Sequence, residues 1–117
     1  MFKGSNPLAN VAGLNDARTL IDVTVDEFYA STFTVEKDGV TVEANGRHQV
    51  TSVSGVPSDA NALQGLLADV WAKVNHDLMV RLVRVRNTVQ KKHRVDIANS
   101  MPEVAEALAY MDAKQAK

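Results

Sequence analysis

A stripe of apolar residues in the second half of the chain restricts its possible folds more than any other feature. The stripe follows the spacing of one face of an α-helix, and its members are Leu63, Leu67, Val70, Trp71, Val74, Leu78, Leu82, Val85 and Val89. Several of them recur every eleven positions, a period of about 3.67 residues per turn that keeps the face nearly straight. Ser58 is a favourable N-cap. We therefore predict one helix over about 59–92, roughly 50 Å long.

The segment 79–86 leaves an alternative open. Val80 and Val83 fall outside the stripe, and the segment is rich in β-branched residues, which lose side-chain freedom in a helix and suit strands. A strand over 79–86 therefore also fits the sequence. The first half of the predicted helix, up to Leu78, has no such competitor.

Before this helix, apolar and polar residues alternate with the period of a strand. Phe33 and Val35 form one such series, and Val40 and Val42 form the next. Between them, the pair Asp38-Gly39 can adopt the positive φ values of a tight hairpin. A two-residue turn there sets Val35 opposite Val42 and keeps the apolar side chains on one face.

The following turn contains Asn45-Gly46 and allows two registers. A two-residue loop would set Val42 opposite Gln49, whereas a three-residue loop over 44–46, with its glycine left-handed, sets Val40 opposite Val50. We prefer the second register because it pairs apolar residues. The result is a three-stranded antiparallel meander over roughly 32–53, with one apolar face that other elements must cover.

The two ends of the chain are predicted from glycine, proline and capping signals. Residues 1–23 are interrupted every few positions and are expected to form an irregular arm. A capping box at 24–27 predicts a short helix, and a second one at 100–103 predicts a helix to about Lys114. The fold class is α+β, in one domain over 1–117 made of the arm, a short helix and meander over 24–56, and a helical part over 57–117.

Positive charge is concentrated near the end of the long helix. Six of the thirteen Lys and Arg residues lie there, namely Arg81, Arg84, Arg86, Lys91, Lys92 and Arg94. Residues 1–80, in contrast, carry ten acidic and five basic side chains. Such segregation favours anionic partners, so we predict an anion- or partner-binding segment, for nucleic acid or an acidic protein surface. The overall pI near 6.3 and the lack of interleaved aromatic residues argue against a dedicated nucleic-acid domain.

The sequence offers no pattern typical of catalysis or metal binding. The chain has no cysteine, and His48, His76 and His93 are scattered without the spacing of metal ligands. Its closest carboxylate pairs fit caps, turns or solvated helix faces, so we expect no catalytic residues, cofactor or metal. No apolar segment approaches membrane-spanning length. We expect a soluble protein without a membrane partner, located in the cytoplasm or in a particle assembled there.

These features favour a non-catalytic, self-associating structural or adaptor subunit of a larger assembly, of the kind that builds a bacterial or viral particle. The chain itself is then the expected partner, through an interface on the apolar stripe that contains Leu67, Trp71, Val74, Leu78, Leu82 and Val85. Two alternatives remain. One is a nucleic-acid-binding module that uses residues 81–94, and the other is an inhibitor or regulator that docks on another protein.

Overall fold

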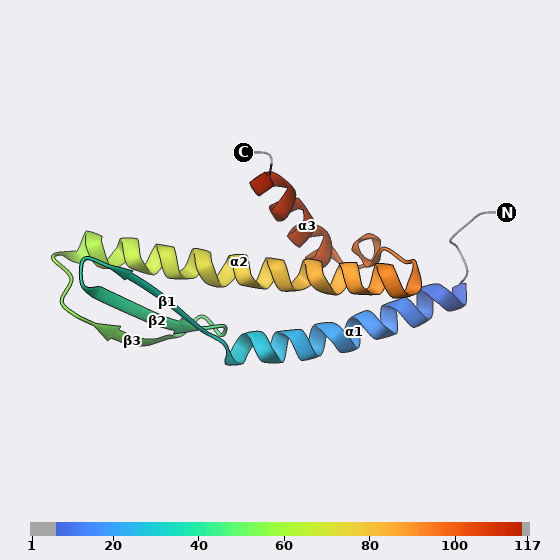
Figure 1. Ribbon diagram of the computed structural model, residues 1–117, viewed down its shortest axis with the longest axis horizontal. Helices are drawn as coiled ribbons and strands as arrows, with labels where there is room; N and C mark the ends of the chain where they lie inside the picture. The colour runs from blue at the N-terminus through green and yellow to red at the C-terminus, as the bar shows by residue number, and fades with distance from the viewer. Residues whose placement is uncertain (1–6, 116–117) are drawn as a thin grey trace. The chain divides into compact units, whose positions relative to one another are not determined.

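The computed structural model describes residues 7–115, which form three α-helices, one three-stranded sheet and a single 3-10 turn (Figure 1). In chain order the elements are α1 (Pro7–Ala30), β1 (Thr32–Lys37), β2 (Val40–Asn45), β3 (Val50–Ser54), α2 (Ala60–His93), η1 (Ile97–Asn99) and α3 (Pro102–Gln115). The α+β class, the antiparallel meander, the long helix and the C-terminal helix are confirmed.

The described residues divide into two compact units. One contains residues 7–25 and 78–115, which we call the helical unit, and the other is Asp26–Asp77, which we call the sheet unit. The boundaries fall inside α1 and α2. That residues 1–117 make up one domain stays a prediction.

Helix α2 agrees with the predicted bounds and excludes the strand alternative over 79–86. Its N-cap is Asp59 and not Ser58, because Asp59 Oδ1 accepts the backbone N–H of Ala62 at 2.8 Å. The last turn contains Lys91, Lys92 and His93. Positive charge at this position interacts favourably with the negative end of the helix dipole.

The expectation of an irregular N-terminal arm is wrong for residues 7–23, which belong to α1, and no new helix begins at Thr24. Tertiary packing outweighs the weak helix propensity of this stretch. Ala17 is fully buried among residues of α2 and η1. A Cβ added at Gly13 would lie 3.4 Å from the Cβ of His93, so the small residue permits a close approach of the two helices. Residues 1–6 lie outside the described part of the chain.

The helical unit has a core of small and branched aliphatic side chains. One cluster contains Ala17, Val85, Val89, Ile97 and Val104, and a second contains Met79, Leu82 and Ala107. The half-buried side chain of Ile21 packs against both clusters. The core of this unit therefore joins α1, the second half of α2 and α3.

The sheet unit confirms the first hairpin and corrects the second turn. Val35 pairs with Val42 as predicted, and Asp38 and Gly39 have φ values of 53° and 81°. In the second pairing, however, Val42 faces Val53 and Ala44 faces Val50, with a bulge between. The predicted pairing of Val40 with Val50 is therefore wrong.

Asn45 explains the longer second loop. Its Oδ1 accepts the backbone N–H groups of Arg47 at 2.9 Å and Gln49 at 3.2 Å. The left-handed residue is His48, with φ 62°, and not Gly46. These side-chain bonds stabilise a loop over 46–49, which forms in place of the tight turn that an Asn-Gly pair favours.

One face of the sheet is covered by the first half of α2. Val40, Val42 and Ala44 on β2 are buried, as is Phe33 on β1, whose ring centroid lies 5.9 Å from that of Phe28. Helix α2 contributes three further buried residues: Leu66, Val70 and Val74. All five residues of β3 are exposed.

Candidate functional site

The structure separates the six basic residues near the end of α2 into paired and unpaired ones. Arg86 donates two hydrogen bonds to Asp96, from Nε to Oδ1 at 3.2 Å and from Nη2 to Oδ2 at 3.0 Å. Lys92 Nζ lies 3.4 Å from Asp16 Oδ2. Arg86 and Lys92 are therefore paired with carboxylates of the chain itself.

The pair of Arg86 and Asp96 positions the connection after α2. The hydrogen bond from Arg86 lowers the pKa of Asp96, although burial acts in the opposite direction. The same bond raises the pKa of Arg86 above its already high ordinary value. Asp96 Oδ1 also accepts the N–H of Ala98 at 3.1 Å and caps η1. These contacts suit a structural role for both side chains.

Asp16 connects α1 to the last turn of α2. Its Oδ2 lies 3.0 Å from His93 Nε2. This hydrogen bond lowers the pKa of Asp16, and the charge of Lys92 lowers it further. Asp16 Oδ2 therefore contacts both Lys92 and His93.

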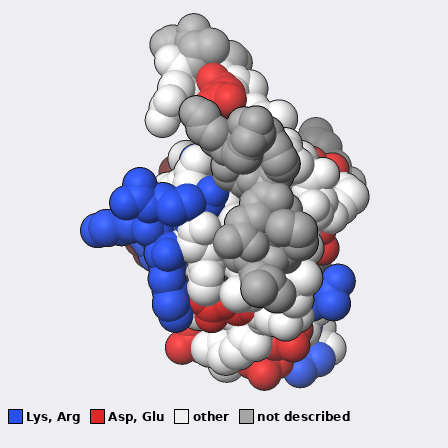
Figure 2. Space-filling view, turned by 90° about the vertical axis from the view of Figure 1, so that its right-hand side faces the viewer, with Lys and Arg blue, Asp and Glu red and all other residues white. Residues whose placement is uncertain are grey.

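Three cations are exposed and make no ion pair among the described residues: Arg84, Lys91 and Arg94. Lys91 and Arg94 line an open hollow of about 420 Å³ together with Asn87 and Gln90. In the view onto this end of α2, the larger group of Lys and Arg side chains lies at the left and smaller groups lie at the lower right (Figure 2). We call Arg84, Asn87, Gln90, Lys91 and Arg94 the basic face.

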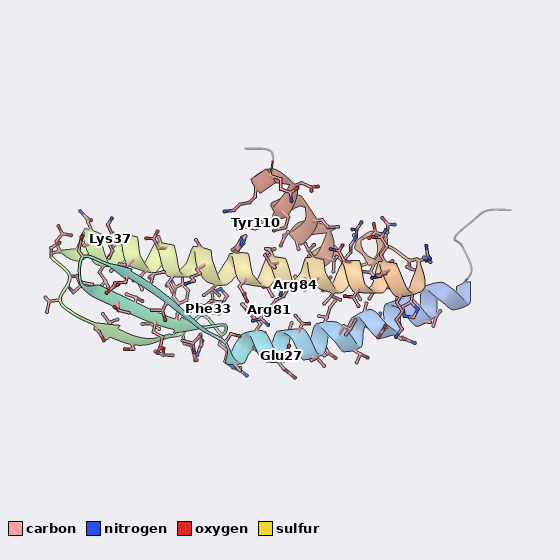
Figure 3. All side chains as sticks on the ribbon, in the orientation of Figure 1. Glu27, Phe33, Lys37, Arg81, Arg84 and Tyr110 are labelled. Atoms are coloured by element: carbon pink, nitrogen blue, oxygen red, sulfur yellow. The ribbon has the colours of Figure 1, made fainter. Side chains whose placement is uncertain are left out.

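Arg81 lies near the basic face but differs from it in burial. Arg81 and Arg84 occupy neighbouring turns in the second half of α2 (Figure 3). Arg84 is exposed, whereas Arg81 is half-buried and makes interactions within the chain. Of the six predicted residues, the structure therefore brings three onto one solvent-exposed face.

Arg94 has an unusual backbone conformation. It follows the last residue of α2 with φ 60°, and its N–H donates to the carbonyl of Gln90 at 2.9 Å. Glycine or asparagine normally occupies this left-handed position after a helix, because a Cβ there is unfavourable. The arginine therefore carries a small conformational cost at the edge of the hollow.

The chemistry available on the basic face is the binding of anions. Amide and cationic donors can hold phosphate or carboxylate oxygens without further groups. Within residues 7–115, no group of three or more His, Asp or Glu side chains has the arrangement of a metal site.

The predicted interface residues on α2 differ in their accessibility. Val74, Leu82 and Val85 are buried within the chain itself. The other three, Leu67, Trp71 and Leu78, are half-buried. The Trp71 ring stacks on His48 with centroids 5.5 Å apart. A charge at Leu82 would disrupt the core of the helical unit. Such a substitution would therefore not test self-association.

The sheet unit exposes apolar side chains that sequence reasoning did not select. Val50 and Val53 of β3 are 42% and 47% exposed, and Val56 in the following loop is 89% exposed. The signal was available in the sequence, because residues 49–58 carry no charge. The sequence does not indicate how far a helix extends across the sheet, and α2 covers β1 and β2 but leaves β3 exposed.

A second hollow, of about 310 Å³, lies beside the first hairpin. Val40 and Leu66 line it together with the exposed Val56, and its polar side chains include Lys37, Asp38 and Asp69. Charges of both signs therefore surround an apolar surface, an arrangement that favours no single class of ligand.

Comparisons with known proteins add no assignment. No protein-family model matches the sequence, and a search of curated proteins also finds no match. None of the helices in the described part of the chain has both the length and the apolar character needed to cross a membrane.

Proposed function

We propose that this chain is a non-catalytic, self-associating structural or adaptor subunit of a larger assembly, of the kind that builds a bacterial or viral particle. The supporting observation is the incomplete cover of the sheet. Helix α2 covers the apolar face over β1 and β2, whereas the valines of β3 remain about half exposed. Exposed apolar surface next to an open strand edge is typical of a site where another chain binds.

Two half-buried residues of the stripe are further candidates for the interface. Leu67 and Trp71 lie on the same half of α2 that covers the sheet. Tryptophan is enriched at the centres of protein interfaces because it buries a large area at a low entropic cost. A contact that covered β3 and reached Trp71 would have the composition of an interface core.

The oligomeric state in solution tests this proposal. We expect sedimentation velocity and light scattering to show a defined oligomer at about 10–100 μM, because an interface of ordinary size gives dissociation constants well below that range. The same oligomer should form without nucleic acid. A wild-type chain that stays monomeric at about 100 μM would contradict the proposal.

The basic face supports a second candidate, a nucleic-acid-binding module. Arg84, Lys91 and Arg94 are exposed and unpaired among the described residues, so they are available to phosphates. Such contacts would not depend on base sequence, because they reach only the backbone. The acidic excess of residues 1–80 opposes the approach of a polyanion, and we therefore rank this function second.

A further inference from the structure

We propose that β3 is the self-association surface and pairs antiparallel with β3 of a second copy, which joins two three-stranded sheets into one sheet of six strands. This inference rests on the proposed function and names the contact that the function requires. Three points support it. The two edge strands differ in their protection, β3 contains a bulge, and an antiparallel pair of identical strands has two-fold symmetry.

The two edge strands of the sheet differ in their protection. On β1, Lys73 Nζ donates to the Thr34 carbonyl at 2.8 Å, and Glu36 and Lys37 place charges on the strand. On β3, no residue is charged, and β3 pairs only with β2 in the described sheet. Charged residues discourage edge-to-edge pairing, whereas an uncharged, open edge favours it. The unprotected edge is therefore β3.

The bulge places both valines of β3 on the apolar face. Val53 pairs with Val42 and Val50 pairs with Ala44, so each lies on the face of a buried β2 residue. Thr51 is the additional residue, and its Oγ1 donates to Glu43 Oε1 at 2.8 Å. Thr51 thus lies on the opposite, solvent-exposed face, and β3 presents an apolar strip of two valines that α2 leaves open.

A two-fold axis perpendicular to the sheet brings the apolar residues of β3 in one copy opposite those of β3 in the other. In one such register the axis passes between Thr51 and Ser52, so that Val50 lies opposite Val53 of the second copy. The valines of both copies then share one face, and the polar residues share the other. Helix α2 of each copy stays on the apolar side of the joined sheet.

A second copy fits this surface better than an unrelated strand for two reasons. First, each copy leaves the same strip uncovered, so the two strips cover each other in one contact. Second, residues 49–58 carry no charge, so two identical edges approach without like-charge repulsion. The main-chain hydrogen bonds of the new pairing would supply affinity. Burial of the four valines would ensure that the apolar faces of the two sheets lie on the same side.

The test compares one lysine on each edge of the sheet. Ser52 on β3 and Thr34 on β1 are both exposed, and both lie opposite Glu43. A lysine at either site can therefore pair with the same carboxylate and leave the monomer fold intact. We expect Ser52→Lys to raise the dimer dissociation constant at least about tenfold, because two lysines meet near the axis, and Thr34→Lys to leave it unchanged.

A cross-linking experiment tests the register directly, since the chain has no cysteine of its own. When Thr51→Cys and Ser52→Cys copies are mixed and mildly oxidised, a mixed disulfide should join the two different copies, because these positions lie opposite each other. A Thr34→Cys copy mixed with either variant serves as the control and should give no such product.

The outcomes separate this inference from the proposed function. A monomeric wild type overturns both. An oligomer that persists in Ser52→Lys at wild-type affinity, or that dissociates equally in Thr34→Lys, overturns the β3 pairing and leaves the structural function standing. Loss of the dimer in Ser52→Lys alone, with the mixed disulfide, supports the pairing. Circular dichroism spectra of both lysine variants should match the wild type.

Discussion

His93 Nε2 and Asp16 Oδ2 lie 3.0 Å apart and connect α1 to the last turn of α2 across 77 positions of sequence. Gly13 lies one turn before Asp16 on α1 and allows the two helices to approach closely. The polar contact and the close packing therefore occur at the same crossing. This arrangement makes the end of α2 part of a folded unit and not a free helix end.

The stability of the helical unit should depend on pH in the acid range. Asp16 and Asp96 have pKa values below the ordinary 3.8 in the folded chain, so their ionised forms stabilise the fold above that pH. This contribution is lost as the pH falls through the lowered folded-state values. We expect the free energy of unfolding, measured with urea, to be lower at about pH 3 than at about pH 6. The double variant Asp16→Asn with Asp96→Asn should show a weaker dependence, and an unchanged slope would contradict the assignment.

Asp96 should contribute to stability at neutral pH through two contacts. Asp96→Ala removes the cap of η1 and both bonds from Arg86, whose side chain is only 24% exposed. We expect a loss of roughly 1–2 kcal/mol in urea unfolding, because a cap alone contributes about 1 kcal/mol. Asp96→Asn keeps an oxygen acceptor for the cap and should lose less. Equal losses in both variants would show that the cap does not matter.

Gly46 should be intolerant of any side chain, for a steric reason. A Cβ at this position would overlap the carbonyl oxygen of Phe28, whereas a Cβ at Gly65 meets no atom within 4 Å. We expect Gly46→Ala to lower the free energy of unfolding by about 2 kcal/mol or more. Gly65→Ala, the matched control inside α2, should raise it by about 0.5–1 kcal/mol. A neutral Gly46→Ala would show that the two segments are not in contact.

Arg94 should be a site where glycine stabilises the chain. Arg94→Gly removes the cost of a Cβ at φ 60° and should increase the free energy of unfolding by roughly 0.5–1 kcal/mol. Arg94→Ala removes the same charge but keeps the Cβ, so it should give no gain. If both variants are equally stable, the charge and not the backbone determines the effect.

The basic face distinguishes the two candidate functions. We expect the wild type to show negligible binding to random duplex DNA at physiological salt, measured by fluorescence anisotropy, because the rest of the chain carries an acidic excess. Tight binding would favour the second candidate if Arg84→Gln, Lys91→Gln and Arg94→Gln together reduced the slope of log affinity against log salt by about 2.7. The control variant changes Arg18, Lys37 and Lys114 to Gln, since these residues are also exposed.

The sequence by itself determined the elements whose signals are local and strong. The stripe from Leu63 to Val89 predicted α2, because a helix buries every third or fourth residue on one face. Asp38-Gly39 predicted the first hairpin and its register, because few residues adopt two successive positive φ values. The segregation of positive charge near the end of α2 was also visible in the sequence.

Tertiary structure decided whatever depends on contacts between distant residues. Helix α1 forms through glycine and asparagine positions because Ala17 is buried against α2 and η1. The Asn45 side chain holds the loop that sets the register of β3. The valines of β3 lie on the apolar face but remain exposed, because α2 covers β1 and β2 only. Pairing with Asp16 and Asp96 removes Lys92 and Arg86 from the unpaired cations. Local propensity cannot encode these outcomes, because each one depends on the free energy of a contact formed only after the chain has folded.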